Sequence, residues 1–234
     1  MKIPNIDYGY WSAHWTETIG QKAIYMNKNM RKFLDFEGSI NECLEEIKKI
    51  VFAEKVEKTE VLRAVDLIYA WGGPSGRLFY AESISKSSPR EKLAGETVFS
   101  DYMKGVSLAK KGNTKSIEAF KHIEGIGPSY GSKHAHFWSL KSKNPLIIID
   151  SKIAGSLGYS ALESLENSVN YEQIIRLFST KSEQEFQDND PVKIERALFS
   201  FHNHYFKNDN SGWKNRSEGK DFNEAQKIAK KLFS

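Results

Sequence analysis

Side-chain patterns that start helices recur along the chain, whereas patterns typical of strands are almost absent. Ser39 is followed three residues later by Glu42, and Asn170 by Gln173. In this spacing each side chain of the pair bonds the backbone amide of the other at the start of a helix. No hairpin dipeptide separates alternating apolar runs. The sequence therefore predicts an all-α fold.

Other helix boundaries follow from the same local chemistry. A serine, threonine or aspartate before a proline or an apolar run favours a helix start, and glycine favours a helix end. Thr59 is predicted to cap a helix that runs through Trp71 and ends at Gly72. Further starts are predicted at Ser88-Pro89, Asp190-Pro191 and Asp221.

Cysteine and histidine usage argues against metal or disulfide chemistry. One cysteine, Cys43, excludes an internal disulfide and any four-cysteine iron–sulfur site. The pairs His134/His136 and His202/His204 are spaced two residues apart. Side chains with that spacing point about 200° apart on a helix and do not easily share one ion. We expect no metal site.

Nothing in the sequence resembles a membrane or export segment. No apolar run approaches the roughly 20 residues that span a bilayer, and the longest apolar stretch of note is 146–149. The first residues lack the apolar region of a secretory signal. We therefore expect a cytoplasmic protein without a membrane partner.

Basic residues are concentrated in one part of the chain. The net charge of +4 is modest, but between residues 104 and 152 the only acids are Glu118, Glu124 and Asp150. Such a stretch is either a solvated face or a surface for a polyanion such as nucleic acid. Its lysines are Lys104, Lys110, Lys111, Lys115, Lys121, Lys133, Lys141, Lys143 and Lys152.

A glycine turn between two helices lies within this basic stretch. An apolar helix runs into Gly125-Ile126-Gly127, and Pro128 starts a second helix. Two glycines allow a tight turn while Ile126 anchors the turn in the core. The turn amides and the positive end of the second helix would then form an anion site suited to a DNA phosphate.

The second helix is followed by a buried extended segment that ends in a carboxylate. The helix is predicted to run to about Leu140, Asn144-Pro145 breaks it, and residues 146–149 are all aliphatic. Asp150 follows directly. Two interpretations are open for Asp150: a carboxylate held at the edge of a dry interior for catalysis, or a cap for the helix that begins at Ser151.

Together, these two segments carry a resemblance to a known family. The stretches IEGIGPS and PLIIIDSKI, with Ser129 preceding Asp150 by 21 residues, resemble the helix-hairpin-helix–GPD signature of base-excision DNA glycosylases. The resemblance covers about 40 residues, in 114–154. Within the superfamily the chain is most similar to prokaryotic 8-oxoguanine DNA glycosylase-fold proteins, which have a Ser/Thr-Lys pair like Ser132-Lys133 in the second helix.

The resemblance implies one helical glycosylase domain over residues 1–234, with two helical subdomains flanking a cleft. Such an enzyme binds DNA mostly through the phosphate backbone, flips a base out of the duplex and cuts its glycosidic bond. It implies no required cofactor, a monomer, and room for a monovalent cation at the hairpin. Asp150 would be catalytic, and the DNA-binding residues would be Gly125, Ile126, Gly127, Ser129 and Lys152.

One position departs from the family pattern. Relatives that also cleave the strand have a catalytic lysine where this chain has Ser129, whereas Lys133 lies four residues later, on nearly the same helical face. Either Lys133 supplies the amine from one turn further along, or the enzyme lacks Schiff-base chemistry. The base pocket is expected to use Trp71 and Trp213.

The substrate and two other functions stay open at this point. The resemblance suggests 8-oxoguanine, or a hypermodified phage base such as glucosylated hydroxymethylcytosine excised in antiviral defence rather than DNA repair. The alternative is a non-enzymatic helix-hairpin-helix DNA-binding module that uses the turn for phosphate contact alone. A helical protein-interaction domain with a chance glycine turn is the remaining hypothesis.

Overall fold

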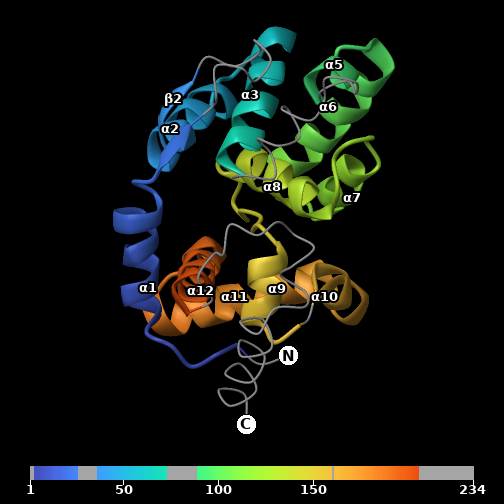
Figure 1. Ribbon diagram of the computed structural model, residues 1–234. Coiled ribbons are helices and arrows are strands. Elements are labelled where there is room, and N and C mark those ends of the chain that lie inside the picture. Colours follow the sequence, from blue (N-terminus) through green and yellow to red (C-terminus); the bar gives the residue numbers. More distant parts are fainter. Residues whose placement is uncertain (1–2, 26–35, 73–88, 160, 206–234) are drawn as a thin grey trace. The chain divides into compact units, whose positions relative to one another are not determined.

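The computed structural model describes residues 3–25, 36–72, 89–159 and 161–205 (Figure 1). These residues are mainly helical, as predicted. The chain divides into two compact units, one formed by residues 1–17 and 147–234 and the other by residues 18–146. The segment 114–154 is therefore shared: its glycine turn belongs to the 18–146 unit and Asp150 to the other.

The 18–146 unit contains a small sheet and a series of helices. Ser39 caps its first helix with the reciprocal bonds to Glu42 that the sequence predicts. Helix α7 packs against both α6 and α8, and α2 packs against α3. The elements are β1 (Ala23–Tyr25), β2 (Glu37–Ser39), α2 (Ile40–Val51), α3 (Lys58–Trp71), α5 (Pro89–Leu93), α6 (Glu96–Lys110), α7 (Lys115–Lys121) and α8 (Pro128–Ser139).

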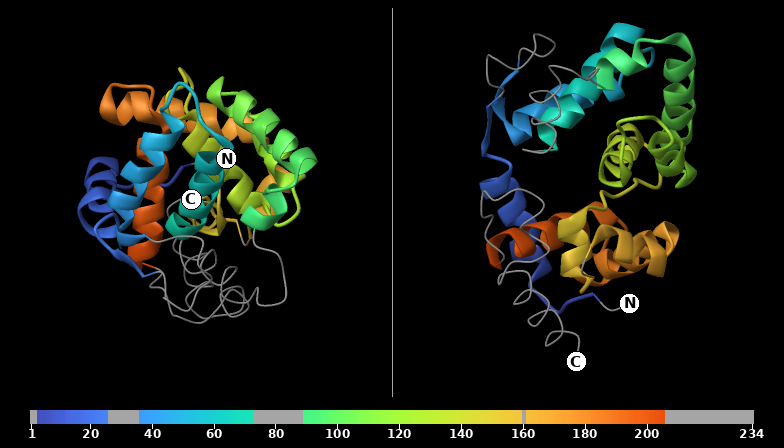
Figure 2. Two further views of the ribbon diagram at one scale, coloured as in Figure 1. Left: turned by 90° about the horizontal axis from the view of Figure 1, so that it is seen from above. Right: turned by 45° about the vertical axis from the view of Figure 1, so that its right-hand side comes forward.

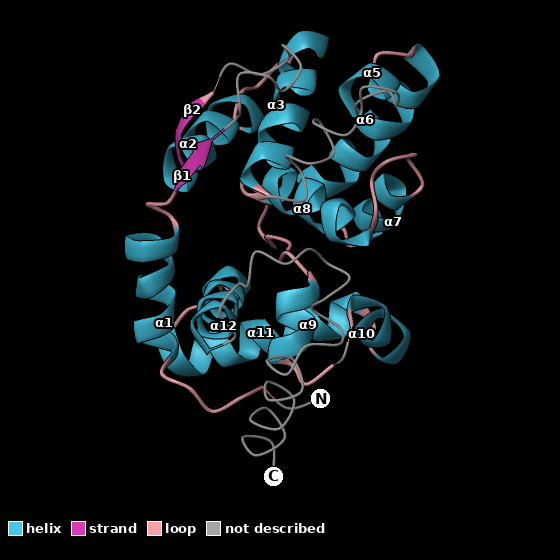
Figure 3. Cartoon of the chain, viewed as in Figure 1, coloured by secondary structure: helices cyan, strands magenta, loops and turns pink. Residues whose placement is uncertain are grey.

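Two expectations about this unit are wrong. Strands β1 and β2 pair in antiparallel fashion, with Ile24 opposite Gly38 (Figure 3), whereas no strands were predicted. Three-residue strands show little alternation, and their pairing depends on a contact between separate segments. In addition, α3 starts one residue before Thr59, because Glu57 and Glu60 form the reciprocal cap instead.

The other unit is built from both ends of the chain. Its helices enclose an apolar core that includes Tyr8, Phe178 and Leu198, together with Ile147 and Ile149 of the predicted buried segment. Helix α1 lies alongside α12 (Figures 1 and 2), and one π-helical turn, η1 (Trp15–Ile19), follows it. The helices are α1 (Tyr8–His14), α9 (Ser151–Ser156), α10 (Leu162–Ser168), α11 (Tyr171–Phe186) and α12 (Pro191–Tyr205).

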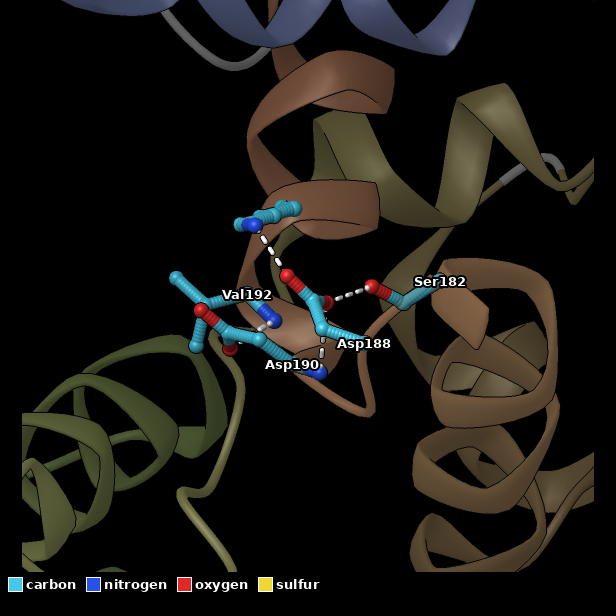
Figure 4. Close-up of polar contacts among 5 residues, drawn as sticks. Ser182, Asp188, Asp190 and Val192 are labelled. Carbon is cyan, nitrogen blue, oxygen red and sulfur yellow. Dashed lines mark hydrogen bonds and ion pairs between the residues drawn. The ribbon is translucent and has the colours of Figure 1, made fainter. Parts of the chain in front are cut away.

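A carboxylate organises the connection between α11 and α12. Asp188 accepts hydrogen bonds from the Ser182 hydroxyl at 2.8 Å, from the Asp190 amide at 3.1 Å and from Lys193 (Figure 4). Burial alone raises the pKa of Asp188, but the bond from Lys193 and the other donors together hold that pKa below its ordinary value. Asp190 accepts from the Val192 amide at 3.0 Å, which confirms the predicted helix start at Asp190-Pro191.

Some predictions fall on other parts of the chain. Ser88, Trp213 and the expected helix start at Asp221 lie outside the described residues. Among the described residues, no helix combines the length and the apolar character that crossing a membrane requires.

Candidate functional site

The glycine turn between α7 and α8 has the geometry that its sequence predicts. Gly125 has φ +92°, a conformation that side chains other than glycine rarely adopt. Ile126 is 2% exposed, and its amide donates to the Ile123 carbonyl at 3.0 Å. Ile126 therefore anchors the turn in the core, as expected, while Gly125 reverses the chain.

A tyrosine from α3 holds the turn in place. The Tyr69 hydroxyl donates to the Gly125 carbonyl at 2.8 Å, and its ring stacks on Tyr130 of α8 with centroids 4.2 Å apart. Burial, with the neighbouring Tyr130 and Tyr102, raises the pKa of Tyr69, so its hydroxyl stays protonated and can donate. Sequence reasoning missed Tyr69, because it lies 56 residues from Gly125 and no local pattern marks the contact.

The start of α8 has no side-chain cap of its own. Gly127 is the N-cap residue, with φ −75°, and it has no side chain to accept a hydrogen bond from the first helical amides. A Cβ atom at Gly127 would have no heavy atom within 4 Å. The first amides of a helix lack carbonyl partners within that helix. This helix start can therefore receive an anion from outside.

Lys133 brings a buried amine back to this helix start. Its Nζ donates to the Ser129 hydroxyl at 2.8 Å and lies 5.3 Å from the centroid of the Tyr130 ring. The residue is only 5% exposed. The prediction that Ser129 and Lys133 share one helical face is confirmed.

The next turn of α8 is fixed by a buried polar network. His134 is fully buried, with Nδ1 2.8 Å from the Tyr102 hydroxyl, which also accepts from Trp138 Nε1 at 2.9 Å. Burial, followed by the charge of Lys133, lowers the pKa of His134 to about 3. His134 is therefore neutral at physiological pH.

Asp150 ends a buried extended segment and caps α9. Residues 146–149 are at most 4% exposed and Asp150 is 8% exposed. Its Oδ1 accepts from the amides of Lys152 at 2.9 Å and Ile153 at 3.1 Å. The capping interpretation of Asp150 thus describes its contacts correctly. The two bonds also fix the carboxylate in one orientation, which a catalytic group needs.

The remaining predicted site residues have partners within their own units. Lys152 Nζ donates to the Asn203 side chain and lies 4.5 Å from the centroid of the Phe199 ring. Trp71 packs edge-on against Phe137 of α8, with centroids 5.0 Å apart, so one side of its ring is occupied. Trp213, the other expected base-pocket residue, is outside the described residues.

A groove of about 620 Å³ borders the turn on its α6 and α7 side. Its apolar wall includes Val98, Ala119 and Ile123. Its rim charges pair with each other, Lys92 with Glu124 and Lys104 with Asp101. Neither Lys133 nor Trp71 lines this groove, and its paired charges are poorly suited to a phosphate.

The two histidines of α8, His134 and His136, point to different places, as their spacing predicts. His134 contacts the Tyr102 hydroxyl, whereas His136 Nδ1 lies 2.7 Å from the Leu146 carbonyl oxygen, so their rings engage different partners. The described residues contain no group of three or more histidine, cysteine, aspartate or glutamate side chains that could hold a metal ion.

Comparison with known proteins adds no family assignment. No protein-family description, no curated protein and no solved structure matches this chain.

Proposed function

We propose that the protein is a DNA glycosylase with a helix-hairpin-helix fold, acting as a monomer in the cytoplasm on a damaged or modified base. The glycine turn and the start of α8 would bind the DNA backbone without reading its sequence. Asp150 and Lys133 would carry the chemistry, with no cofactor required. The sequence resemblance of residues 114–154 and the geometry of the turn support this proposal.

The observation that carries the proposal is the bond between Lys133 Nζ and the Ser129 hydroxyl at 2.8 Å. In the family that the sequence resembles, the reacting lysine occupies the position of Ser129. Lys133 starts one turn later and brings its amine back to that position. A buried amine beside a helix start that can bind a phosphate would be placed to attack a sugar held by its phosphates.

The proposed reaction starts with cleavage of the bond between the sugar C1′ and the base. The bonding electrons leave with the base, and positive charge develops on the sugar. The fixed carboxylate of Asp150 would stabilise that charge. The Lys133 amine would then form a bond to C1′. A proton would pass from the nitrogen to the ring oxygen O4′ as the C1′–O4′ bond breaks, and the resulting imine would permit elimination of the 3′ phosphate, which cleaves the strand. Without the amine, water would attack C1′ and leave an abasic site.

The bonds of Asp150 give specific support to a second candidate function, a non-enzymatic DNA-binding module. Two amides of α9 already account for Oδ1 of this carboxylate. In that case Asp150 would be a cap only, and the turn would bind phosphate without any reaction. A glycosylase would release a base from DNA, whereas a binding module would not.

The first experiment identifies the substrate. The full chain is incubated with host DNA, with a duplex containing 8-oxoguanine and with hypermodified phage DNA, and released bases are measured by mass spectrometry. We expect one of these substrates to release a base. Tight DNA binding with no release from any of them would favour the binding module.

The second experiment tests the role of Lys133. Borohydride reduces an imine and traps a covalent complex between protein and DNA. We expect this complex with the native chain and with Lys121→Gln, a control on α7 that removes an ion-paired lysine. We expect none with Lys133→Gln, which keeps a side-chain N–H for Ser129. Base release without a trapped complex in the native chain would show that Lys133 is not the nucleophile.

A further inference from the structure

The structure separates the lysines of the basic stretch into distinct groups. Lys104 and Lys121 form ion pairs with Asp101 and Glu118. Lys133 is buried, and Lys152 belongs to the other unit. The remaining five are all exposed, and we call them the lysine cluster: Lys110, Lys111, Lys115, Lys141 and Lys143.

Contacts of the backbone bring the members of the lysine cluster together. The turn between α6 and α7 packs so closely on the segment after α8 that a Cβ atom at Gly112 would lie 2.5 Å from the Asn144 carbonyl oxygen. Lys111 and Lys115 flank that turn, and Lys143 precedes Asn144. Lys110 Nζ lies 5.6 Å from the centroid of the Trp138 ring near the end of α8.

The lysine cluster also differs from other lysines in its lack of acidic partners. Within the described ranges, none of its five members forms an ion pair, although Lys141 donates to the Phe52 carbonyl at 2.9 Å. Most other exposed or half-exposed lysines of these ranges have a carboxylate partner. Those that do are Lys48, Lys49, Lys58, Lys92, Lys104, Lys121, Lys181 and Lys193.

We propose that the lysine cluster is a second surface for a nucleic-acid backbone, separate from the glycine turn. Five positive charges without counter-charges attract a polyanion over long range. The turn precedes α8 and the cluster surrounds its other end, about 18 Å away for a 12-residue helix. Phosphates bound at the two places therefore belong to different stretches of the backbone.

Nucleic acid fits this surface better than a membrane does. Surfaces that insert into a bilayer combine basic residues with exposed large apolar side chains. The described residues have one exposed large hydrophobic side chain, Tyr10, and it belongs to the other unit. The choice of nucleic acid over an acidic protein as the partner rests on the proposed function. The charged surface itself follows from the exposure of the five lysines and from their lack of ion pairs within the described residues.

The test compares two triple variants with equal loss of charge. Lys111, Lys115 and Lys143 are changed to glutamine in one, and the ion-paired Lys48, Lys49 and Lys181 in the other. Binding of an unmodified DNA duplex is measured by fluorescence anisotropy from about 50 to 200 mM salt. We expect the first variant to reduce the slope of log affinity against log salt by about 2 to 3, because each phosphate contact contributes about 0.9.

The control variant should leave that slope nearly unchanged. An equal reduction in both variants would show an effect of net charge alone and overturn the proposal, as would an unchanged slope in the first variant. The lysine-cluster variant could also lose binding to polyglutamate or to anionic vesicles while its salt dependence of DNA binding stays unchanged. That result would overturn the proposal, because the cluster would then bind a polyanion other than nucleic acid. Matching thermal unfolding curves check that both variants are folded.

Base release by the same variants distinguishes this proposal from the proposed function. At low salt we expect the lysine-cluster variant to release a base at the native rate, because the cluster is remote from Lys133. If the native chain releases no base but the salt dependence of DNA affinity still falls in the lysine-cluster variant, the glycosylase proposal is wrong and the proposed nucleic-acid surface is supported. If the native chain releases a base but the salt dependence of DNA affinity is unchanged in the lysine-cluster variant, only the proposed nucleic-acid surface is wrong.

Discussion

Helices α8 and α9 both begin directly after the end of a turn or extended segment, yet their first turns are completed in opposite ways. The start of α8 has glycine at the N-cap and no side-chain cap. The start of α9 has Asp150 at the N-cap, and its carboxylate accepts from two backbone amides. The first can accept an anion from outside, whereas the second already contains one.

This difference makes the two helix starts suited to groups of opposite charge. A negatively charged phosphate is favoured at the α8 start, where the helix dipole is uncompensated, and disfavoured beside the Asp150 carboxylate. A fixed carboxylate instead suits a group that becomes positive, such as a sugar losing its base. Under the proposed function, backbone binding would fall to the start of α8 at Gly127 and charge stabilisation to Asp150.

The largest expected effect comes from removing the charge at α9 while keeping its cap. Asparagine caps helices about as well as aspartate, so Asp150→Asn should leave the free energy of unfolding nearly unchanged. Base release should fall at least about 100-fold, because the developing positive charge loses its partner. Single-turnover release and DNA affinity are measured together; unaltered release would leave Asp150 with the capping role alone.

A second variant removes the difference between the two helices by giving α8 a carboxylate N-cap like that of α9. Gly127→Asp supplies a carboxylate cap, and the open space around Gly127 accommodates it. Stability should change by only a few tenths of a kcal/mol. DNA affinity should fall roughly 10-fold, because the amides are occupied and the new charge repels phosphate. Gly127→Ala is the control for side-chain size, and equal affinity of all three proteins would remove the turn from the DNA interface.

The two glycines of the turn should differ in what they contribute. Gly125→Ala forces an alanine into φ +92°, and the free energy of unfolding should fall by about 1–2 kcal/mol. Gly127→Ala has an ordinary φ and free space, but alanine is a poorer N-cap than glycine, so the free energy of unfolding should fall by less than about 1 kcal/mol. Urea unfolding measures both. Equal destabilisation would mean that Gly127 is needed for the turn itself.

The last prediction concerns the body of α8 and the pH dependence of stability. His134 has a pKa near 3 in the folded protein, against about 6.5 when unfolded. The unfolded chain therefore gains a proton below pH 6.5 that the folded chain does not. The free energy of unfolding should therefore be unaffected by His134 above that pH and fall by about 1.4 kcal/mol per pH unit below it. Urea unfolding from about pH 7.5 to 5 should show a shallower fall in His134→Gln; parallel curves would contradict the prediction.

Features that depend on neighbouring residues were predicted well from the sequence. The reciprocal caps at Ser39 and Asn170 involve side chains three residues away, and both are present. The bond between Ser129 and Lys133 follows from helical periodicity in the same way. Ile126 was predicted as the buried anchor because it alone is apolar between two glycines.

Features that depend on distant residues were missed for a physical reason. Tyr69 reaches Gly125 across 56 residues, and Lys152 reaches Asn203 across 51. The pairing of β1 with β2 likewise joins separate segments. The basic stretch was recognised as a whole, but only the ion pairs and the packing at Gly112 divide it into paired, buried and unpaired lysines.

The assembly of one unit from both ends of the chain has a consequence for synthesis on the ribosome. Residues 18–146 emerge as one uninterrupted segment, so the sequence of this unit is complete before residue 147 is made. Helix α1 emerges before that segment, but its neighbours α11 and α12 emerge after it. Domains generally fold as units during translation. The apolar face of α1 therefore stays exposed, or is covered by a chaperone, until α11 and α12 have emerged and can pack against it.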